Sequence, residues 1–155
     1  MSTLTVTVTE AVVLNGNQMG GSNMASLDVS NATQIVKSCP PQAETVLGNY
    51  AATVNATAYA NFDFDNSIYT RITNLSTTDY IEAAFVSLDD KEVADSCRFL
   101  LLPNQSAIMY NAKGGKLGEC SVPNFARSMT NLAYITIFNR SEENAVNIEV
   151  FNASK

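Results

Sequence analysis

The chain contains no histidine and no tryptophan among its 155 residues. Histidine is the usual general base, the commonest metal ligand and the partner of the nucleophile in Ser-His and Cys-His pairs. Its absence argues strongly against hydrolase and metalloenzyme chemistry and leaves only mechanisms built from carboxylates. We therefore expect a protein that is not an enzyme and that binds neither a cofactor nor a metal ion.

Charged residues are scarce as well, at 15% of the chain compared with about 25% in an average globular domain. Asparagine, serine and threonine take their place. Uncharged polar groups cost less to desolvate than lysine or glutamate, and charged groups are depleted from the centres of protein interfaces. The composition thus predicts a surface that is partly covered by other subunits, although high β propensity and many turns would give a similar composition.

The net charge of −6 and the isoelectric point near 4.5 argue against a nucleic-acid partner, which would require a basic stripe. The nine lysines and arginines are scattered. The sequence has no apolar run approaching the ~18 residues of a membrane span, and residues 1–10 lack the basic and apolar regions of a signal peptide. We expect no nucleic-acid or membrane partner and synthesis without Sec export.

The three cysteines are Cys39, Cys97 and Cys120, and no two form a C-x-x-C pair. An odd number at these spacings is a poor disulfide framework and a poor zinc site. We expect free thiols that are buried as small apolar residues. One disulfide with one free thiol is the alternative.

The clearest strand signal is at the N-terminus, where Leu4, Val6 and Val8 alternate with threonines. The segment before Lys37 is almost uncharged and contains no basic residue. Such a segment would suit a sheet edge that pairs with a partner chain, with Leu4, Val6 and Val8 at the interface. Pairing inside its own sheet is the alternative. A turn at residues 15–17 and a strand at residues 24–29 follow.

One pattern occurs twice, at residues 69–88 and 134–151. Each copy has an alternating apolar/polar run, a short loop that begins with Asn-x-Ser, and a second alternating run. Asparagine, aspartate and serine favour turns because their side chains bond nearby backbone. The loop residues are Asn74, Ser76 and Asp79 in the first copy and Asn139, Ser141 and Asn144 in the second. The pattern predicts two β-hairpins.

Further strands are predicted at residues 34–39, 43–54, 96–102 and 106–110, and the last two are expected to pair. A helix is the alternative at residues 43–54, because Ala43, Leu47, Ala51 and Val54 have the spacing of one helix face. The run at residues 81–88 is apolar on both faces, which is typical of a strand inside a packed sandwich or one covered by a partner. The final run, at residues 145–151, is also expected inside the sheet system.

Two acidic patterns are weak candidates for chemistry. Asn61, Asp63 and Asp65 place oxygen atoms at alternate positions, as in a calcium loop. However, Asn66 and Ile72 occupy the positions where that loop requires glycine and glutamate. The acidic turn at residues 89–92 is expected to be solvated rather than catalytic. Neither pattern predicts a metal or catalytic site.

The glycine-rich segment at residues 113–118 superficially resembles a phosphate loop, but it lacks the GxxxxGK[ST] pattern and a clear following helix. It is expected to be a long exposed loop, and loop tips are common contact sites. The predicted contact residues are Lys113, Gly114, Gly115 and Lys116.

Short strands, turn signals about every 8–12 residues and almost no helical periodicity predict an all-β protein. We predict a single domain, residues 1–155, folded as an antiparallel β-sandwich of roughly 8–10 strands with jelly-roll or immunoglobulin-like topology.

The opening at residues 4–16, a Thr/Val-rich strand that runs into a Leu-Asn-Gly turn, resembles the start of small structural proteins of marine tailed bacteriophages. The pattern at residues 69–88 and the ending at residues 146–152 are similar too, whereas residues 36–59 show no close correspondence. The resemblance implies a virion protein made in the host cytoplasm, as a capsid decoration or knob-like protein. Its partners would be the major capsid protein, other virion proteins or its own copies in a homo-oligomer.

The alternative function is a tail-fibre, neck or adhesion module that binds carbohydrate. Sugar sites commonly place an exposed aromatic ring beside aspartate or asparagine. Because the chain has no tryptophan, Tyr50, Tyr59 or Tyr110 would have to supply that ring.

Overall fold

The computed structural model describes residues 2–50, 60–62, 66–88, 94–110 and 132–155, and this part of the chain is built from β-strands. None of it forms a helix with the length and apolar character needed to cross a membrane. The strands are β1 Ser2–Thr9, β2 Val12–Leu14, β3 Asn17–Met19, β4 Ser22–Val29, β5 Asn31–Cys39, β6 Glu44–Asn49, β7 Ala60–Asn61, β8 Ser67–Asn74, β9 Ile81–Leu88, β10 Ala94–Leu101, β11 Ser106–Tyr110, β12 Leu132–Asn139 and β13 Val146–Ser154.

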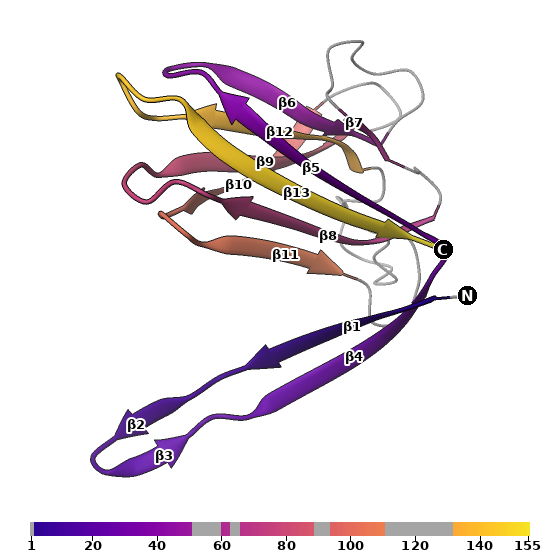
Figure 1. Cartoon of the computed structure of the whole chain (residues 1–155), viewed down its shortest axis with the longest axis vertical. Helices are drawn as coiled ribbons and strands as arrows, with labels where there is room; N and C mark the ends of the chain where they lie inside the picture. The colour runs from indigo at the N-terminus through magenta and orange to yellow at the C-terminus, as the bar shows by residue number, and fades with distance from the viewer. Residues whose placement is uncertain (1, 51–59, 63–65, 89–93, 111–131) are drawn as a thin grey trace.

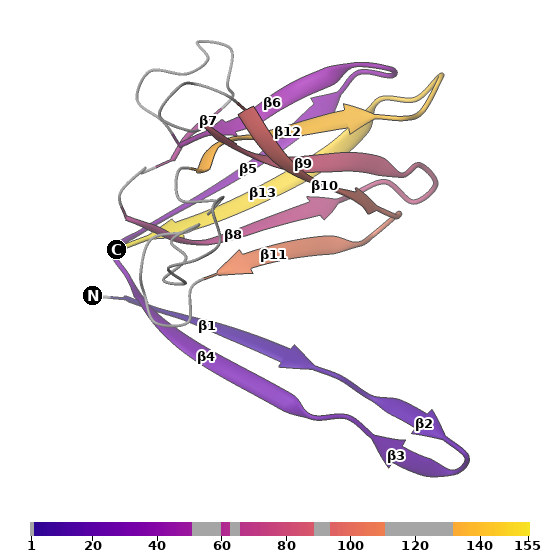
Figure 2. The ribbon, with the colours of Figure 1, turned by 180° about the vertical axis from the view of Figure 1, so that it is seen from behind.

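Two sheets pack face to face as a sandwich, which confirms the predicted fold class (Figures 1 and 2). One sheet has the order β10-β9-β12-β6-β7 and the other β11-β8-β13-β5. All neighbouring strands are antiparallel except β6 and β7, which are parallel. Strands β9 and β13 lie in the interior of their sheets, as predicted. The largest of the fully buried apolar side chains between the sheets include Leu47, Ile72, Ile81, Ile135, Ile137, Ile148 and Val150.

The two predicted hairpins are wrong. Strand β8 belongs to the four-stranded sheet and β9 to the five-stranded sheet, and β12 and β13 are divided in the same way. Each Asn-x-Ser loop is therefore an arch that crosses from one sheet to the other. Strand β8 pairs instead with β13, and β9 pairs with β12. Period-two alternation predicts which side chains face the core. It does not distinguish a hairpin from an arch, because both connections bury the same side chains.

The predicted pairing of β10 with β11 is wrong for the same reason, because β10 pairs with β9 and β11 with β8. The link from β5 to β6 also crosses between the sheets. The four arches stack in one order, so that β11, β8, β13 and β5 lie opposite β10, β9, β12 and β6. Eight strands joined by sheet-crossing loops in this order form a jelly roll rather than an immunoglobulin-like sandwich.

A buried asparagine stands at the corner of each of the two similar arches. The Asn139 side-chain amide donates to the backbone carbonyls of Cys39, at 2.9 Å, and Asn144, at 2.8 Å. Its Oδ1 accepts a hydrogen bond from the Ser141 amide at 2.9 Å. One side chain thus shapes its own loop and also ties that loop to the neighbouring arch.

Asn74 has the same role in the first arch. Its amide donates to the carbonyls of Asp79, at 2.9 Å, and Leu101, at 3.1 Å, and its Oδ1 accepts from the Ser76 amide at 3.0 Å. Both asparagines are fully buried. The turn chemistry of Asn-x-Ser was therefore predicted correctly, although the direction in which the chain leaves the turn was not.

Strands β1 to β4 form a long arm that projects from the sandwich (Figures 1 and 2). Strand β1 pairs with β4 over its whole length, and β2 pairs with β3 at the tip. The tip turns at Asn15 and Gly16, whose φ angles are 51° and 79°. Positive φ at both central residues is typical of a type I′ hairpin turn. The N-terminal strand therefore pairs within its own chain.

The base of the arm is fixed to the sandwich by a second apolar cluster. Val6, Leu27 and Val29 from the arm pack against Ile68, Tyr69 and Ala153 from the ends of β8 and β13. Past Ser30, whose amide bonds the Ser154 carbonyl, β4 leads directly into β5 of the sandwich. The arm is thus an outward extension of a sandwich strand.

Candidate interaction surfaces

The outer part of the arm exposes apolar side chains. Val13 is 74% exposed and Met24 is 67% exposed. Six of the twelve large hydrophobic residues that are exposed in the described part of the chain lie on the arm, namely Val8, Val12, Val13, Leu14, Met19 and Met24. Monomeric proteins rarely expose large apolar patches to water, so this concentration makes the arm a candidate interaction surface.

The arm is a two-stranded ribbon with no further strand to stabilise it among the described residues. A two-stranded ribbon is marginally stable at best in water. Within the described residues, the sheet formed by β1 and β4 contains no third strand. The outward edges of both strands are therefore available for strand addition, which is a common mode of protein recognition.

The predicted contact residues of the N-terminal strand differ in their exposure to solvent. Val6 is buried and Leu4 is half-buried in the cluster at the arm base, whereas Val8 is 41% exposed. Burial of Leu4 and Val6 within their own chain leaves Val8 as the residue of this set that is available to a partner. The predicted loop contacts Lys113, Gly114, Gly115 and Lys116 lie outside the described residues, as does the acidic turn at residues 89–92.

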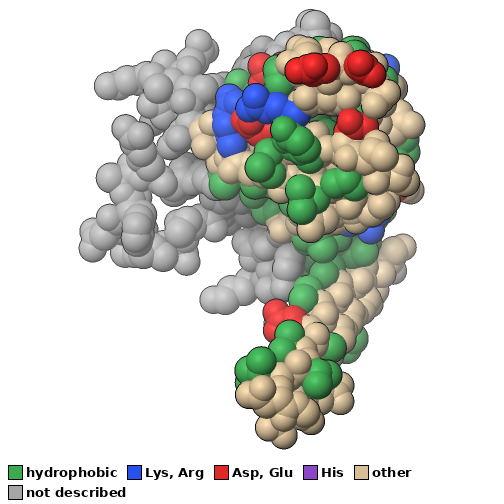
Figure 3. Space-filling view, turned by 90° about the vertical axis from the view of Figure 1, so that its left-hand side faces the viewer, with side chains coloured by type: hydrophobic (Ala, Val, Ile, Leu, Met, Phe, Trp, Pro, Cys, Tyr) green, Lys and Arg blue, Asp and Glu red, His purple; other side chains and the backbone are tan. Residues whose placement is uncertain are grey.

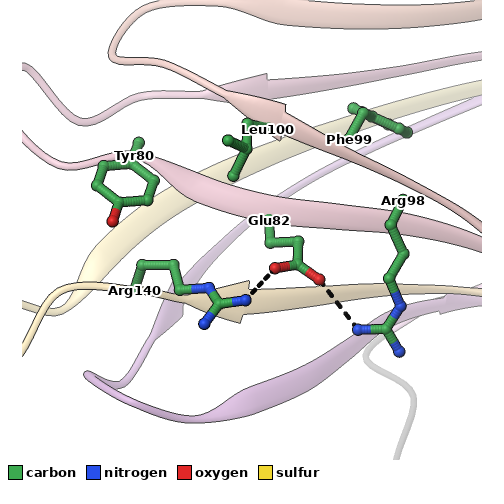
Figure 4. A pocket seen from close by; sticks show the side chains of 6 residues that line it. All are labelled: Tyr80, Glu82, Arg98, Phe99, Leu100 and Arg140. Atoms are coloured by element: carbon green, nitrogen blue, oxygen red, sulfur yellow. Dashed lines mark hydrogen bonds and ion pairs between the residues drawn. The ribbon is translucent and has the colours of Figure 1, made fainter.

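A shallow pocket of about 350 Å³ lies on the outer face of the five-stranded sheet, at the end where the arch loops are (Figure 4). Its walls are Tyr80, Glu82, Arg98, Phe99, Leu100 and Arg140. Strand β9 brings these residues together, because it pairs with β10 on one side and with β12 on the other. Sequence analysis missed the pocket because its residues come from three separate segments.

Glu82 lies between two arginines in this pocket (Figure 4). Its carboxylate accepts a hydrogen bond from Arg98 Nη1 at 3.0 Å and another from Arg140 Nη2. The hydrogen bonds from Arg140 and Arg98 lower the pKa of Glu82 below its ordinary value. Two guanidinium groups and one carboxylate leave the pocket with a net charge of +1.

The remaining contacts set the character of the pocket. The Arg140 guanidinium lies 4.8 Å from the centre of the Phe138 ring, which holds it against the sheet by a cation–π contact. Tyr80 and Leu100 are 47% and 58% exposed and supply apolar surface beside the charges. The pocket therefore combines an aromatic ring, an aliphatic side chain and a positive charge.

Of the three tyrosines that sequence analysis offered as a sugar platform, the structure describes the side chain of Tyr50 alone. The prediction for Tyr50 is wrong, because this residue is 3% exposed and its hydroxyl contacts Thr70 Oγ1 at 2.5 Å inside the sandwich. Burial raises the pKa of Tyr50 well above its ordinary value. Tyr59 and the side chain of Tyr110 lie outside the described structure. Tyr80, which the sequence did not single out, is exposed.

The other candidate residues are only partly described. Cys39 is buried, as expected, and burial raises the pKa of its thiol. Cys97 lies on the edge strand β10 and is exposed, so its predicted burial is wrong. Both thiols are free, and Cys120 lies outside the described residues together with Asp63 and Asp65. Among the residues that the structure does describe, no acidic or cysteine cluster could hold a metal ion.

Comparison with known proteins finds a likeness at the level of structure. Neither a scan against protein-family models nor a search of curated proteins finds a match. Among solved structures, the chain is similar to a family 11 carbohydrate-binding module from Clostridium thermocellum in complex with a β-1,3-1,4-mixed-linked tetrasaccharide. The sequence identity is 10%, the alignment covers 98% of this chain and 86% of that chain, and the TM-score is 0.32. A likeness of this degree carries no information about function.

Proposed function

We propose that this protein is a non-enzymatic structural component of a bacteriophage virion, of the capsid decoration or knob-like kind, which attaches to other protein subunits through its arm. Its partners would be the major capsid protein or its own copies. The observation that carries the proposal is the projecting arm with its exposed apolar side chains. The resemblance of residues 4–16, 69–88 and 146–152 to small phage structural proteins supplies the virion context.

The energetics of the arm suit this role. Full burial of one valine, leucine or methionine side chain contributes about 1.5–3 kcal/mol. Six such side chains would supply on the order of 10 kcal/mol before the cost of association is subtracted. In a repeating shell, many copies engage at once, so a modest contact per copy still gives a firm attachment.

The proposal is tested by cosedimentation with capsids that lack the protein. The wild-type chain should sediment with the capsids, and the Val13→Asp variant should be recovered mostly in the supernatant. Val36→Asp is a matched control, because Val36 is 58% exposed on β5 of the sandwich. Equal sedimentation of the wild type and Val13→Asp would contradict an attachment through the arm. Mass spectrometry of purified particles would give the copy number and distinguish a shell protein from a tail or neck component.

Carbohydrate binding in a tail-fibre or adhesion module is a second candidate, and the pocket favours it. Tyr80 offers an exposed ring beside Glu82, Arg98 and Arg140, whose polar atoms would hydrogen-bond to sugar hydroxyls. A glycan array with the isolated protein tests this function. Binding that disappears in Tyr80→Ala, together with no binding to capsids, would favour this candidate over the virion proposal.

A further inference from the structure

Two surfaces of this molecule present side chains of complementary character. The tip of the arm presents apolar side chains, and the pocket at the arch end of the sandwich presents Tyr80 and Leu100 beside two arginines. Figure 3 shows the arch end of the molecule, with apolar side chains at the arm tip and apolar, basic and acidic side chains gathered on the sandwich. The two surfaces lie on different parts of the molecule, one on the arm and the other on the sandwich.

The charges of the two surfaces are opposite. The only charged residues before Lys37 are Glu10 and Asp28, so the described arm carries negative charge alone. Glu10 is exposed in the segment between β1 and β2, next to Val12 and Val13. The pocket has a net charge of +1, since Glu82 offsets one of its two arginines. A carboxylate that arrives with apolar neighbours would find a guanidinium group and an apolar wall there.

The position of the pocket also suits a β-ribbon. Arg98, Phe99 and Leu100 belong to β10, which is the edge strand of its sheet in the described structure. A strand laid beside β10 would bond its open backbone edge while its side chains enter the pocket. The arm tip is a short two-stranded ribbon with open edges of its own.

We propose that the arm tip of one copy docks into the pocket of a second copy, where Val13 covers Tyr80 and Leu100 and Glu10 pairs with Arg98 or Arg140. This inference deepens the proposed function and rests on it. The contact is heterologous, because different surfaces of the two copies meet. Repetition of a heterologous contact produces a closed ring or an open chain, and both are suited to covering a larger particle.

The first test measures self-association of the full-length protein by sedimentation velocity over a wide range of concentration. Val13→Asp and Leu100→Asp should each weaken association about tenfold or more, because each buries a charge in the contact and removes apolar surface from it. Val36→Asp should associate like the wild type. All three side chains are exposed, so the variants should keep the wild-type circular-dichroism spectrum.

The second test mixes the two damaged variants. The Val13→Asp chain keeps an intact pocket and the Leu100→Asp chain keeps an intact arm, so one sound contact can form between them. The mixture should give a heterodimer and no larger species, although each variant alone remains monomeric. An isologous contact between two arms would instead leave Leu100→Asp fully associated and would overturn the inference.

The outcomes separate this inference from the proposed function. If the wild type sediments with capsids but never self-associates, or if Leu100→Asp leaves self-association unchanged, the arm-to-pocket contact is wrong and the virion role stands. If the protein neither binds capsids nor associates, both are wrong. A monomer whose pocket binds glycans, and loses them in Leu100→Asp, would also overturn the inference.

Discussion

The sandwich and the arm are made from the same kind of sequence but have opposite surroundings. In both, β-branched and polar residues alternate along antiparallel strands. In the sandwich a second sheet covers the apolar face, so that residues such as Ile148 and Val150 are fully buried. In the outer arm nothing among the described residues covers it, and Val13 is 74% exposed. Alternation alone thus predicts a strand, and the presence or absence of a covering layer decides whether its apolar face stabilises the fold or stays exposed to solvent.

The sharpest test of this division compares Ile148→Ala with Val13→Ala. Ile148 has no exposed surface, and truncation of a buried isoleucine costs about 2–5 kcal/mol because a cavity remains. Val13→Ala should change the free energy of unfolding by less than about 0.5 kcal/mol, as expected for an exposed site. Urea denaturation measures both values. A comparable loss in the two variants would mean that the arm contributes to the stability of the fold.

A second test concerns the arch corners. Asn139→Ala should lower the free energy of unfolding by about 2–4 kcal/mol, because two backbone carbonyls, one buried and one partly buried, lose hydrogen bonds and each loss costs about 1–3 kcal/mol. The carbonyls are those of Cys39 and Asn144. Asn17→Ala, at an exposed position of the arm, is the matched control and should be close to neutral. If Asn139→Ala proves equally neutral, the asparagine corner does not hold the arches together.

Much of the sandwich could be predicted from sequence, because its strands follow local rules. The alternation at residues 146–150 places Val146, Ile148 and Val150 on one face of the strand, and the structure buries all three. The turn at residues 15–17 follows from the conformational freedom of asparagine and glycine. These features depend on neighbouring residues only, so a single sequence contains enough information to find them.

The partners of the strands could not be predicted in the same way. A loop such as residues 75–80 can either return along the same sheet or cross to the other, and both choices bury the same side chains. The pocket was missed for the same reason, since Tyr80, Leu100 and Arg140 meet only through the pairing of β9 with both of its neighbours. The position of the arm likewise depends on Ser30, where the chain leaves the sandwich. Information of this kind lies in long-range packing rather than in local pattern.

The smallest expected effect is a loss of folding stability at acidic pH, which arises from carboxylates of the sandwich. Hydrogen bonds from Thr78 and Ser141 lower the pKa of Asp79, and Arg71 lowers that of Glu149. Because these pKa values are lower in the folded state than in the unfolded chain, the stabilisation is fully present above the unfolded values of about 4. It is lost as the pH falls through the folded values.

Asp79 is the most informative of these carboxylates because it joins two arches. It follows β8 in the first arch, and it also accepts hydrogen bonds from Ser141 and Asn144 of the second. We expect the urea midpoint of the wild type to fall between pH 7 and about pH 3. The fall should be smaller in Asp79→Asn, which has no carboxylate to protonate at this position. Identical midpoint changes in the two proteins would show that the contact between the loops of the similar arches does not depend on the charge of Asp79, leaving contacts such as the hydrogen bond from the Leu75 amide to the Asn147 carbonyl, at 2.9 Å, to hold these arches together.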